Sequence, residues 1–285
     1  MEVNCMETTN LEIRLLLEAI YMKYGYDFRN YGQAHLKRRI LHRKNLEDFE
    51  TIADMVKEVI YNQEFFDRLL LDLSINVTEM FRDPSFYQAI REKVIPQLRT
   101  YPFLKIWHAG CASGEEVYSM AILLEEEGLY DKVQLYATDF NQMILKKARQ
   151  GIYPMDRIKQ YTSNYQKSGG KNSFADYYSA KYDSVIINPS IKRNIVFADH
   201  NLVLDGVFGE MNMVICRNVL IYFNTDLQNH VIRLFLDSLT HGGFLALGSR
   251  ESLRFTDYYE KFTEVSASEK IYKKQTIVPK SRISA

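Results

Sequence analysis

Apolar residues recur at helical intervals between residues 11 and 73, and the alternation typical of strands is almost absent there. One helical face would carry Leu11, Leu15, Leu16, Ala19 and Ile20. A second would carry Ile52, Met55, Val56, Val59 and Ile60. We therefore expect residues 1–75 to form a small all-helical domain, with these apolar residues turned inward.

From residue 103 onward, short apolar runs alternate with helical patterns, as in a parallel α/β domain. We expect a linking segment over 76–102, in which Asp83 or an earlier residue caps a helix that begins at Pro84 and runs to Leu98. The α/β domain would then occupy 103–285. Its expected strands are 105–109, 133–138, 194–202, 211–223 and 244–247, with a turn at 241–243 and a closing hairpin of strands 262–265 and 270–274. Its expected helices are 115–127, 142–149 and 227–239.

The alternation is interrupted between residues 151 and 194, which predicts an inserted subdomain. Ser168–Ser173 has the composition of a flexible loop. The runs 182–187 and 191–197 are expected to form short strands on either side of Asn188-Pro189.

Composition limits the range of partners and compartments. Lys plus Arg and Asp plus Glu both number 36 among 285 residues, so the net charge of zero gives no general attraction to nucleic acid or to a membrane. We find neither a membrane-length apolar run nor a signal peptide and expect a cytoplasmic protein, with a monomer favoured. Cys5, Cys111 and Cys216 form no C-x-x-C pair, so we expect reduced thiols and no metal site.

A strand followed by a glycine-containing turn and a helix lies between Lys105 and Tyr118. Gly110 and Gly114 would let the backbone bend sharply and approach a ligand, although their spacing differs from the dinucleotide fingerprint. Glu115 and Glu116 open the helix and would repel a phosphate, so the expected ligand carries hydroxyls or an amine. An ordinary turn of a parallel sheet is the alternative.

Asp139 follows the second expected strand. In open α/β sheets an acid at this place commonly accepts hydrogen bonds from both ribose hydroxyls of a nucleoside. Capping of the helix that begins at Gln142 is the other interpretation, and the two are compatible. Ligands of such sheets bind beyond the carboxyl ends of the strands, so we expect a shared site for Gly110, Asp139, Asn201, Arg217 and Tyr222.

Two further segments have unusual polar patterns. Between Gln33 and Asn45, Leu36, Ile40 and Leu41 can face inward while the basic residues spread outside, which fits either a solvated face or a docking surface for an acidic partner. Those basic residues are Lys37, Arg38, Arg39, His42, Arg43 and Lys44. In the second segment, Asn76, Thr78 and Arg82 interrupt an apolar run; capping and turn hydrogen bonds would explain the first two, and an exposed arginine needs no explanation.

Five ordered motifs together resemble the CheR family, the S-adenosylmethionine-dependent methyltransferases that esterify glutamates of bacterial chemotaxis receptors. The motifs are Asn76-x-Thr-x-x-Phe-Arg82, Ala109-Gly-Cys-Ala-Ser-Gly-Glu-Glu-x-Tyr-Ser119, Ala137-Thr-Asp139, Val196-Phe-x-x-His-Asn-Leu202 and Cys216-Arg-Asn-Val-Leu-Ile-Tyr-Phe223. The resemblance covers nearly the whole chain. It implies a Rossmann-like methyltransferase sheet, a helical N-terminal domain and an inserted antiparallel β-subdomain.

The resemblance also implies roles for individual residues. The cofactor, S-adenosyl-L-methionine, with S-adenosyl-L-homocysteine as product, would be bound by Asn76, Thr78, Arg82, Glu116, Asp139, Asn201, Leu202, Arg217 and Asn218. Arg82 and Tyr222 would lie beside the transferred methyl group. The basic residues Lys37, Arg38, Arg39, His42 and Arg43 would face the cytoplasmic helical region of a chemoreceptor or another signalling protein.

The sequence departs from the family pattern at Ser113 and Val117, where threonine and proline are common, and in a longer insert. The insert leaves the target open. Two alternatives to receptor methylation therefore remain: carboxyl methylation of a soluble protein or small acid, and a non-catalytic module that binds the cofactor and a partner.

Overall fold

The computed structural model describes residues 2–74 and 78–276, which form two compact units. The first unit contains the helices before residue 75 together with Leu220–His230. The second contains 78–219 and the chain after residue 230. Among the described residues, no helix is long and apolar enough to cross a membrane.

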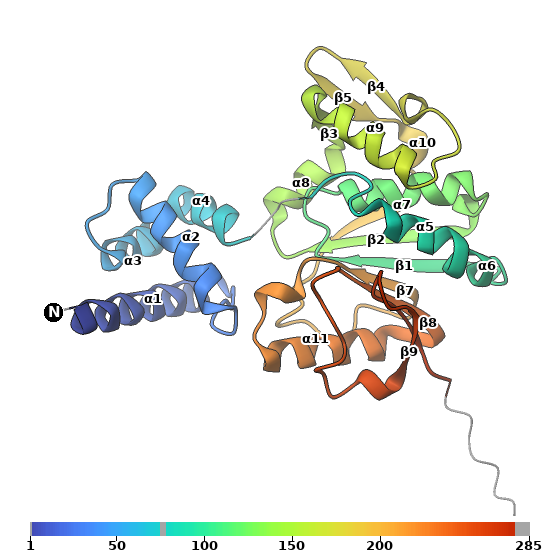
Figure 1. The fold of residues 1–285 in the computed structure, drawn as a ribbon. Coiled ribbons are helices and arrows are strands. Elements are labelled where there is room, and N and C mark those ends of the chain that lie inside the picture. The colour runs from blue at the N-terminus through green and yellow to red at the C-terminus, as the bar shows by residue number, and fades with distance from the viewer. Residues whose placement is uncertain (1, 75–77, 277–285) are drawn as a thin grey trace, which may run out of the picture. The chain divides into compact units, whose positions relative to one another are not determined.

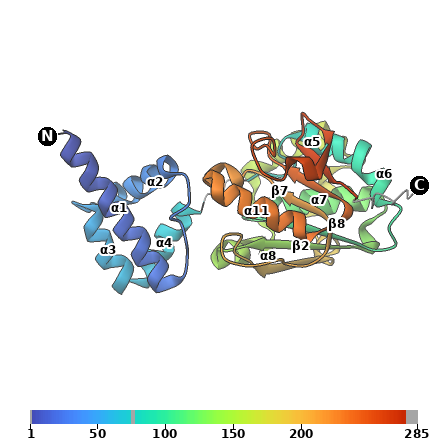
Figure 2. The same cartoon turned by 90° about the horizontal axis from the view of Figure 1, so that it is seen from below.

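The first unit is helical, as expected (Figures 1 and 2). Its elements are α1 (Glu2–Tyr24), α2 (Gln33–Leu46), α3 (Ile52–Tyr61), α4 (Gln63–Leu73) and the short 3-10 helix η5 (Leu220–Tyr222). A capping box between Thr51 and Asp54 begins α3, and the Asn62 side chain caps α4.

The inward face of α1 differs from the one predicted. Ile13, Leu16, Leu17 and Ile20 are buried, whereas Leu11 and Leu15 are 58% and 52% exposed. Residues 13, 16, 17 and 20 follow the helical period and form one stripe, so 11 and 15 fall on the opposite side. The apolar residues of α1 therefore occupy two faces, and the sequence does not show which one the other helices cover.

The second unit is built on a seven-stranded sheet of order β6-β2-β1-β7-β8-β10-β9. Its strands are β1 (Leu104–Ala109), β2 (Val133–Asp139), β6 (Ile195–Asp199), β7 (Met211–Cys216), β8 (Leu239–Leu247), β9 (Phe262–Ser266) and β10 (Ile271–Lys274). β6, β2, β1, β7 and β8 are parallel, and β10 pairs antiparallel with both β8 and β9. The expected sheet and closing hairpin are thus confirmed; Cys111 lies just beyond β1, and Cys216 is the last residue of the neighbouring β7.

Several strand boundaries were predicted wrongly, and the third expected strand, for example, ends at Asp199 instead of Leu202. The fourth strand ends at Cys216 instead of Phe223, because Asn218 adopts a left-handed backbone with φ 63° that a strand cannot continue. The expected turn at 241–243 lies inside β8, where a register shift against β7 accommodates Gly242 and Gly243.

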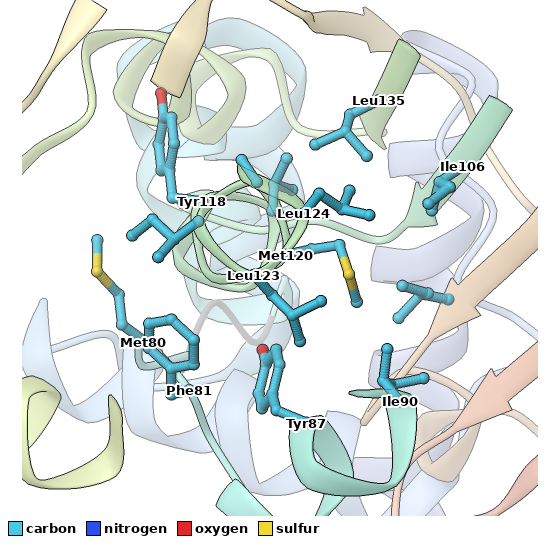
Figure 3. Packing of buried hydrophobic residues seen from close by; sticks show 14 of the residues in the cluster. Met80, Phe81, Tyr87, Ile90, Ile106, Tyr118, Met120, Leu123, Leu124 and Leu135 are labelled. Atoms are coloured by element: carbon cyan, nitrogen blue, oxygen red, sulfur yellow. The ribbon is translucent and has the colours of Figure 1, made fainter. Parts of the chain in front are cut away.

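Helix α7 (Glu115–Glu126) forms the centre of the core. Its Met120, Leu123 and Leu124 pack among Ile106 and Leu135 of the sheet and Phe81, Tyr87 and Ile90 of the segment that precedes it (Figure 3). Phe81 precedes a continuous helical stretch that contains Tyr87 and Ile90 and is made of α5 (Pro84–Ala89), the π-helical turn η1 (Ile90–Val94) and α6 (Ile95–Leu98). Pro96 lacks a backbone N–H, and the wider turn lies just before it.

The insert forms a separate antiparallel sheet of order β3-β5-β4. Its elements are β3 (Ile152–Pro154), η3 (Met155–Arg157), α9 (Ile158–Lys167), η4 (Phe174–Tyr177), β4 (Tyr178–Lys181), β5 (Ser184–Ile187) and α10 (Pro189–Lys192). The predicted strand beginning at Ile191 is wrong, because Pro189 starts a helical turn and β6 begins only at Ile195. Residues 168–173 form a loop, and the Glu126 carboxylate holds it by accepting hydrogen bonds from the Tyr177 hydroxyl and the Lys171 amide.

Candidate functional site

The loop after β1 is shaped by residues with left-handed backbones. Gly110 has φ 76°, Ala112 φ 48° and Gly114 φ 92°. The amides of Gly110 and Cys111 donate to the Thr138 carbonyl at 2.9 and 2.8 Å, which fixes the loop against the end of β2. A Cβ on Gly110 would lie 2.7 Å from Cγ2 of Val219, so glycine is required there for packing as well as for its backbone conformation.

Asp139 joins this loop to the following turn. Its buried carboxylate accepts hydrogen bonds from the Ala112 and Asn141 amides, both at 3.0 Å. Burial raises the pKa of Asp139 to about 6, which the two backbone hydrogen bonds only partly offset. Helix α8 (Gln142–Gln150) is capped by the Asn141 side chain, so the helix-cap interpretation of Asp139 is wrong.

A chain of charged side chains crosses the site beside α7. Glu116 accepts from Arg217 Nη1 at 3.2 Å and lies 3.1 Å from His108 Nδ1, and Arg217 Nη2 donates to Asp83 at 2.6 Å. Burial raises the pKa of Glu116, but the His108 hydrogen bond and the Arg217 charge outweigh it and hold the pKa below its ordinary value. The Arg217 guanidinium also lies 4.1 Å from the Phe86 ring centroid.

The segment that carries Thr78 and Arg82 is anchored at several points. The Phe81 amide donates to Ser119 Oγ at 2.8 Å, and Asn164 Nδ2 of the insert donates to the Met80 carbonyl at 3.0 Å. Arg217 Nη1 also reaches the Arg82 carbonyl at 3.4 Å. Asn76 lies outside the described residues.

Asn201 and Leu202 follow β6 beside Asp139. Asp139 is in register with Asp199, and the His200 amide donates to the Asp139 carbonyl at 3.3 Å. Asn201 Oδ1 accepts from the Val203 amide, and Leu202 is buried. The second unit therefore brings Glu116, Asp139, Asn201, Arg217 and Asn218 to the carboxyl ends of adjacent strands.

Other site predictions fall in the first unit. Tyr222 lies there, with its ring edge-on to the His35 ring at a centroid distance of 5.5 Å. Of the basic residues on α2, Arg38 and His42 are exposed and Lys37 is half-buried. Arg39 donates to the Asp72 carbonyl at 3.0 Å.

The prediction that Arg43 faces outward is wrong. Arg43 is buried and pairs with Asp72 at 2.6 Å and with Glu47 at 3.0 Å. Residues 39 and 43 are one helical turn apart on the side that meets α4, so only part of the basic segment is left for a partner.

Sequence reasoning missed three residues that hydrogen-bond to predicted site residues: Asp83 bonds to Arg217, His108 to Glu116, and Glu251 to the Asn218 amide. The sequence predicts that Asp83 or an earlier residue caps the helix; Asp83 does occupy the N-cap position, but its side chain makes no capping hydrogen bond and pairs with Arg217. A histidine in the buried strand before the glycine turn was an available signal for His108. Glu251 follows an exposed arginine in a loop, and nothing in its sequence context marks it.

The residues of the second unit fit a charged nucleoside cofactor. Asp139 can accept from hydroxyl groups, Glu116 provides negative charge, and Arg217 can meet a carboxylate. Among the described residues, His108 Nε2 and Arg217 Nε are buried without a hydrogen-bond partner, which leaves polar atoms for a bound ligand. No group of three or more His, Cys, Asp or Glu residues in the described part of the chain could hold a metal ion.

The strand order, the glycine loop after β1 and the acid at the end of β2 define a Rossmann-like methyltransferase domain. The chain belongs to the CheR methyltransferase family: residues 76–271 match the model described as "CheR methyltransferase, SAM binding domain" and residues 11–74 match "CheR methyltransferase, all-alpha domain". It is therefore an S-adenosylmethionine-dependent methyltransferase.

Relatives of similar length support this assignment. A protein of Pseudomonas putida (strain KT2440) that carries the name methyltransferase Cher3 is 50% identical over 93% of this chain and 97% of its own length. The chemotaxis protein methyltransferase of Listeria innocua is 30% identical over 80% of this chain and 85% of its own. That of Borreliella burgdorferi is 28% identical over 86% and 89%.

Proposed function

We propose that this protein transfers the methyl group of S-adenosylmethionine to glutamate carboxylates of a chemoreceptor-like signalling protein, giving the methyl ester and S-adenosylhomocysteine. The observation that carries the proposal is the match to both family domains, in order, along one chain. Cofactor binding alone would account for the second domain and would leave the all-α domain without a role. Relatives that match both parts are named chemotaxis protein methyltransferases.

The reaction makes small demands on acid–base chemistry. A glutamate side chain has an ordinary pKa of about 4.3, so it is ionised at neutral pH and attacks without a general base. The bound cofactor supplies a methyl group on a positively charged sulfur. Charge is neutralised as the methyl group moves, so the protein contributes mainly by aligning the reactants and excluding water.

We assign cofactor binding to the residues grouped in the second unit. Asp139 accepts from the ribose hydroxyls, Glu116 provides negative charge for the positively charged end of the cofactor, and Arg217 meets its carboxylate. Thr78, Arg82, Asn201, Leu202 and Asn218 complete the contacts, and Asn76 is assigned by resemblance. Arg82 and Tyr222 are assigned to the methyl transfer step, where the Tyr222 ring would favour a cationic sulfur.

We assign receptor docking to the basic residues that α2 leaves available, Lys37, Arg38 and His42, and not to Arg39, which donates to the Asp72 carbonyl. Arg38 and His42 are exposed and one helical turn apart, as expected for a surface that meets acidic side chains. Arg43 is not assigned to docking, because Asp72 and Glu47 already neutralise it.

The test is methyl transfer from radiolabelled S-adenosylmethionine to membranes and soluble proteins of the source organism. Carboxyl methyl esters release labelled methanol in mild alkali, and alkali-labile label on a membrane protein is the expected result. Label confined to a soluble acceptor would contradict receptor methylation and would favour a soluble protein or a small acid as the methyl acceptor. Cofactor binding without transfer to any acceptor would favour a non-catalytic module.

Matched variants test the residue assignments in the same assay. Arg82→Lys and Tyr222→Leu should suppress transfer, because the second variant removes the aromatic ring, whereas Arg254→Lys and Tyr61→Leu, at exposed positions, should not. Full activity in either of the first two variants would remove that residue from the transfer step.

A further inference from the structure

Glu251 places a buried carboxylate against three backbone amides. It lies on the loop after β8 and is 4% exposed. Its Oε2 accepts from the Asn218 amide at 3.0 Å and its Oε1 from the Val219 amide at 2.8 Å, and the Gly248 amide also donates to Oε2. Both oxygens are therefore engaged with the backbone, and the carboxylate joins the loop after β8 to the turn after β7.

The turn that Glu251 holds has a left-handed backbone. Asn218 has φ 63°, in a region that few residues other than glycine, asparagine and aspartate adopt. Such conformations persist where the surroundings fix them. A Cβ on Gly248 would lie 2.8 Å from the Asn218 amide nitrogen, so the two loops are in direct backbone contact and leave no room for a side chain.

Two parts of the cofactor site depend on the position of this turn. Arg217 precedes Asn218 and pairs with Glu116 at 3.2 Å. Val219 follows it and packs so closely on the loop after β1 that a Cβ on Gly110 would lie 2.7 Å from its Cγ2. A shift of the turn would therefore move Arg217 away from Glu116 and loosen the packing on Gly110.

We propose that Glu251 is a positioning residue for cofactor binding: it holds the Asn218–Val219 turn, and through it Arg217 and Asn218, in the geometry that receives S-adenosylmethionine. It acts through these two residues and does not touch the ligand. The inference rests on the proposed cofactor-binding roles of Arg217 and Asn218.

The test is Glu251→Gln in the full chain. An amide keeps one acceptor oxygen but turns an NH2 group towards backbone N–H donors, so at least one of the three hydrogen bonds is lost. Calorimetric titration should show the Kd for S-adenosylmethionine rising about 10- to 100-fold, since small displacements of binding groups have effects of this size. In the cofactor-free variant, hydrogen exchange of the Asn218 and Val219 amides should become faster.

Glu126→Gln is the matched control. The Glu126 side chain is fully buried and also accepts from a backbone amide and a tyrosine hydroxyl, but it lies in the last turn of α7, whereas Glu116 lies in the first. It should lower the thermal unfolding temperature while leaving the Kd unchanged. If Glu251→Gln fails to fold, Glu251→Asp keeps the charge on a shorter side chain and should give a smaller rise in Kd.

An unchanged Kd in the folded Glu251 variant would overturn the proposal. So would an equal rise in the Glu126 control, because it would show a general effect of losing a buried carboxylate. Both readouts use only the cofactor and the backbone amides. A failure to methylate a receptor would therefore count against the proposed acceptor and leave this result standing.

Discussion

Arg217 Nη2 lies 2.6 Å from Asp83 Oδ2, which ties the turn after β7 to the residue before α5 across 134 positions of sequence. Arg217 also pairs with Glu116, and its side chain is 2% exposed, compared with 38% for that of Asp83. The pair therefore has one buried and one accessible partner, and the two should respond differently to substitution.

Arg217→Ala should destabilise the protein by about 3 kcal/mol, because it removes the buried partner of the pair and leaves the half-buried Glu116 with His108 as its remaining partner. Asp83→Asn should cost about 1 kcal/mol or less, since Glu116 still neutralises Arg217 and solvent reaches position 83. Denaturant unfolding of both variants checks the order. If both variants lost the same free energy of unfolding, Glu116 would not be the partner that mainly neutralises Arg217.

The Arg217→Ala loss should also depend on pH. Glu116 has a lowered pKa in the folded protein, so its pairing contributes stability above the ordinary value of 4.5 that disappears as the pH falls through the folded pKa. The difference in the free energy of unfolding between the wild type and Arg217→Ala should therefore become smaller in acid. A constant difference from pH 7 down to about 3 would show that the charge of Glu116 is not involved.

Cofactor affinity should fall in mild acid because of Asp139. Its pKa is about 6 without ligand, and the ionised form is the better acceptor for ribose hydroxyls. The Kd for S-adenosylmethionine should rise as the pH falls below 6, approaching about tenfold per unit. Titrations between about pH 5 and 8 measure this. Asp139→Asn should bind weakly and lose that dependence, and a wild-type Kd independent of pH would exclude Asp139.

Glu115 should destabilise the fold at neutral and alkaline pH. Its pKa is raised to about 7, mainly by burial, although the Ser113 hydroxyl donates to it at 2.6 Å. A raised carboxyl pKa means that the folded state holds the proton more tightly, so stability falls as the pH rises from 4.5 through 7. Glu115→Gln should therefore raise the free energy of unfolding at pH 8 by up to about 3 kcal/mol, with little gain at pH 4. If Glu115→Gln had the same free energy of unfolding as the wild type at pH 8, the ionised Glu115 would not destabilise the fold.

Arg43 and Arg38 should have separable effects although both lie on α2. Arg43→Ala should lower stability by about 3 kcal/mol, because it removes a buried guanidinium and takes the ion-pair partner from Asp72, while Glu47 keeps its pair with Arg68. Arg38→Ala should leave unfolding unchanged and reduce receptor methylation through a higher KM for the receptor. Thermal unfolding and initial rates distinguish the two, and normal kinetics in Arg38→Ala would remove that side chain from the docking surface.

Gly110→Ala tests the contact between the cofactor loop and Val219. The new Cβ would lie 2.7 Å from Val219 Cγ2 on a backbone with φ 76°, so S-adenosylmethionine binding should be lost. Adding Val219→Ala removes the close contact but not the backbone strain, so it should restore affinity only in part. Full restoration would show that the contact alone requires glycine.

The sequence by itself determined the parts of this protein that depend on local pattern. Apolar periodicity gave the helical N-terminal region, the alternating strands and helices, and the closing hairpin. The glycines after β1 and the acid at the end of β2 predicted where a cofactor would bind, because those residue types are needed wherever a backbone must bend sharply or a hydroxyl must be bound.

Tertiary structure alone decided which of several equivalent residues took each role. Leu11 and Ile13 are both apolar, but the neighbouring helices cover only the face that carries Ile13. Arg38 and Arg43 are both basic, but Asp72 of α4 pairs with Arg43. Glu251 is an ordinary loop residue until the strand order brings the turn after β7 against it. Burial and pairing between segments distant in sequence set these outcomes, and local periodicity carries no information about them.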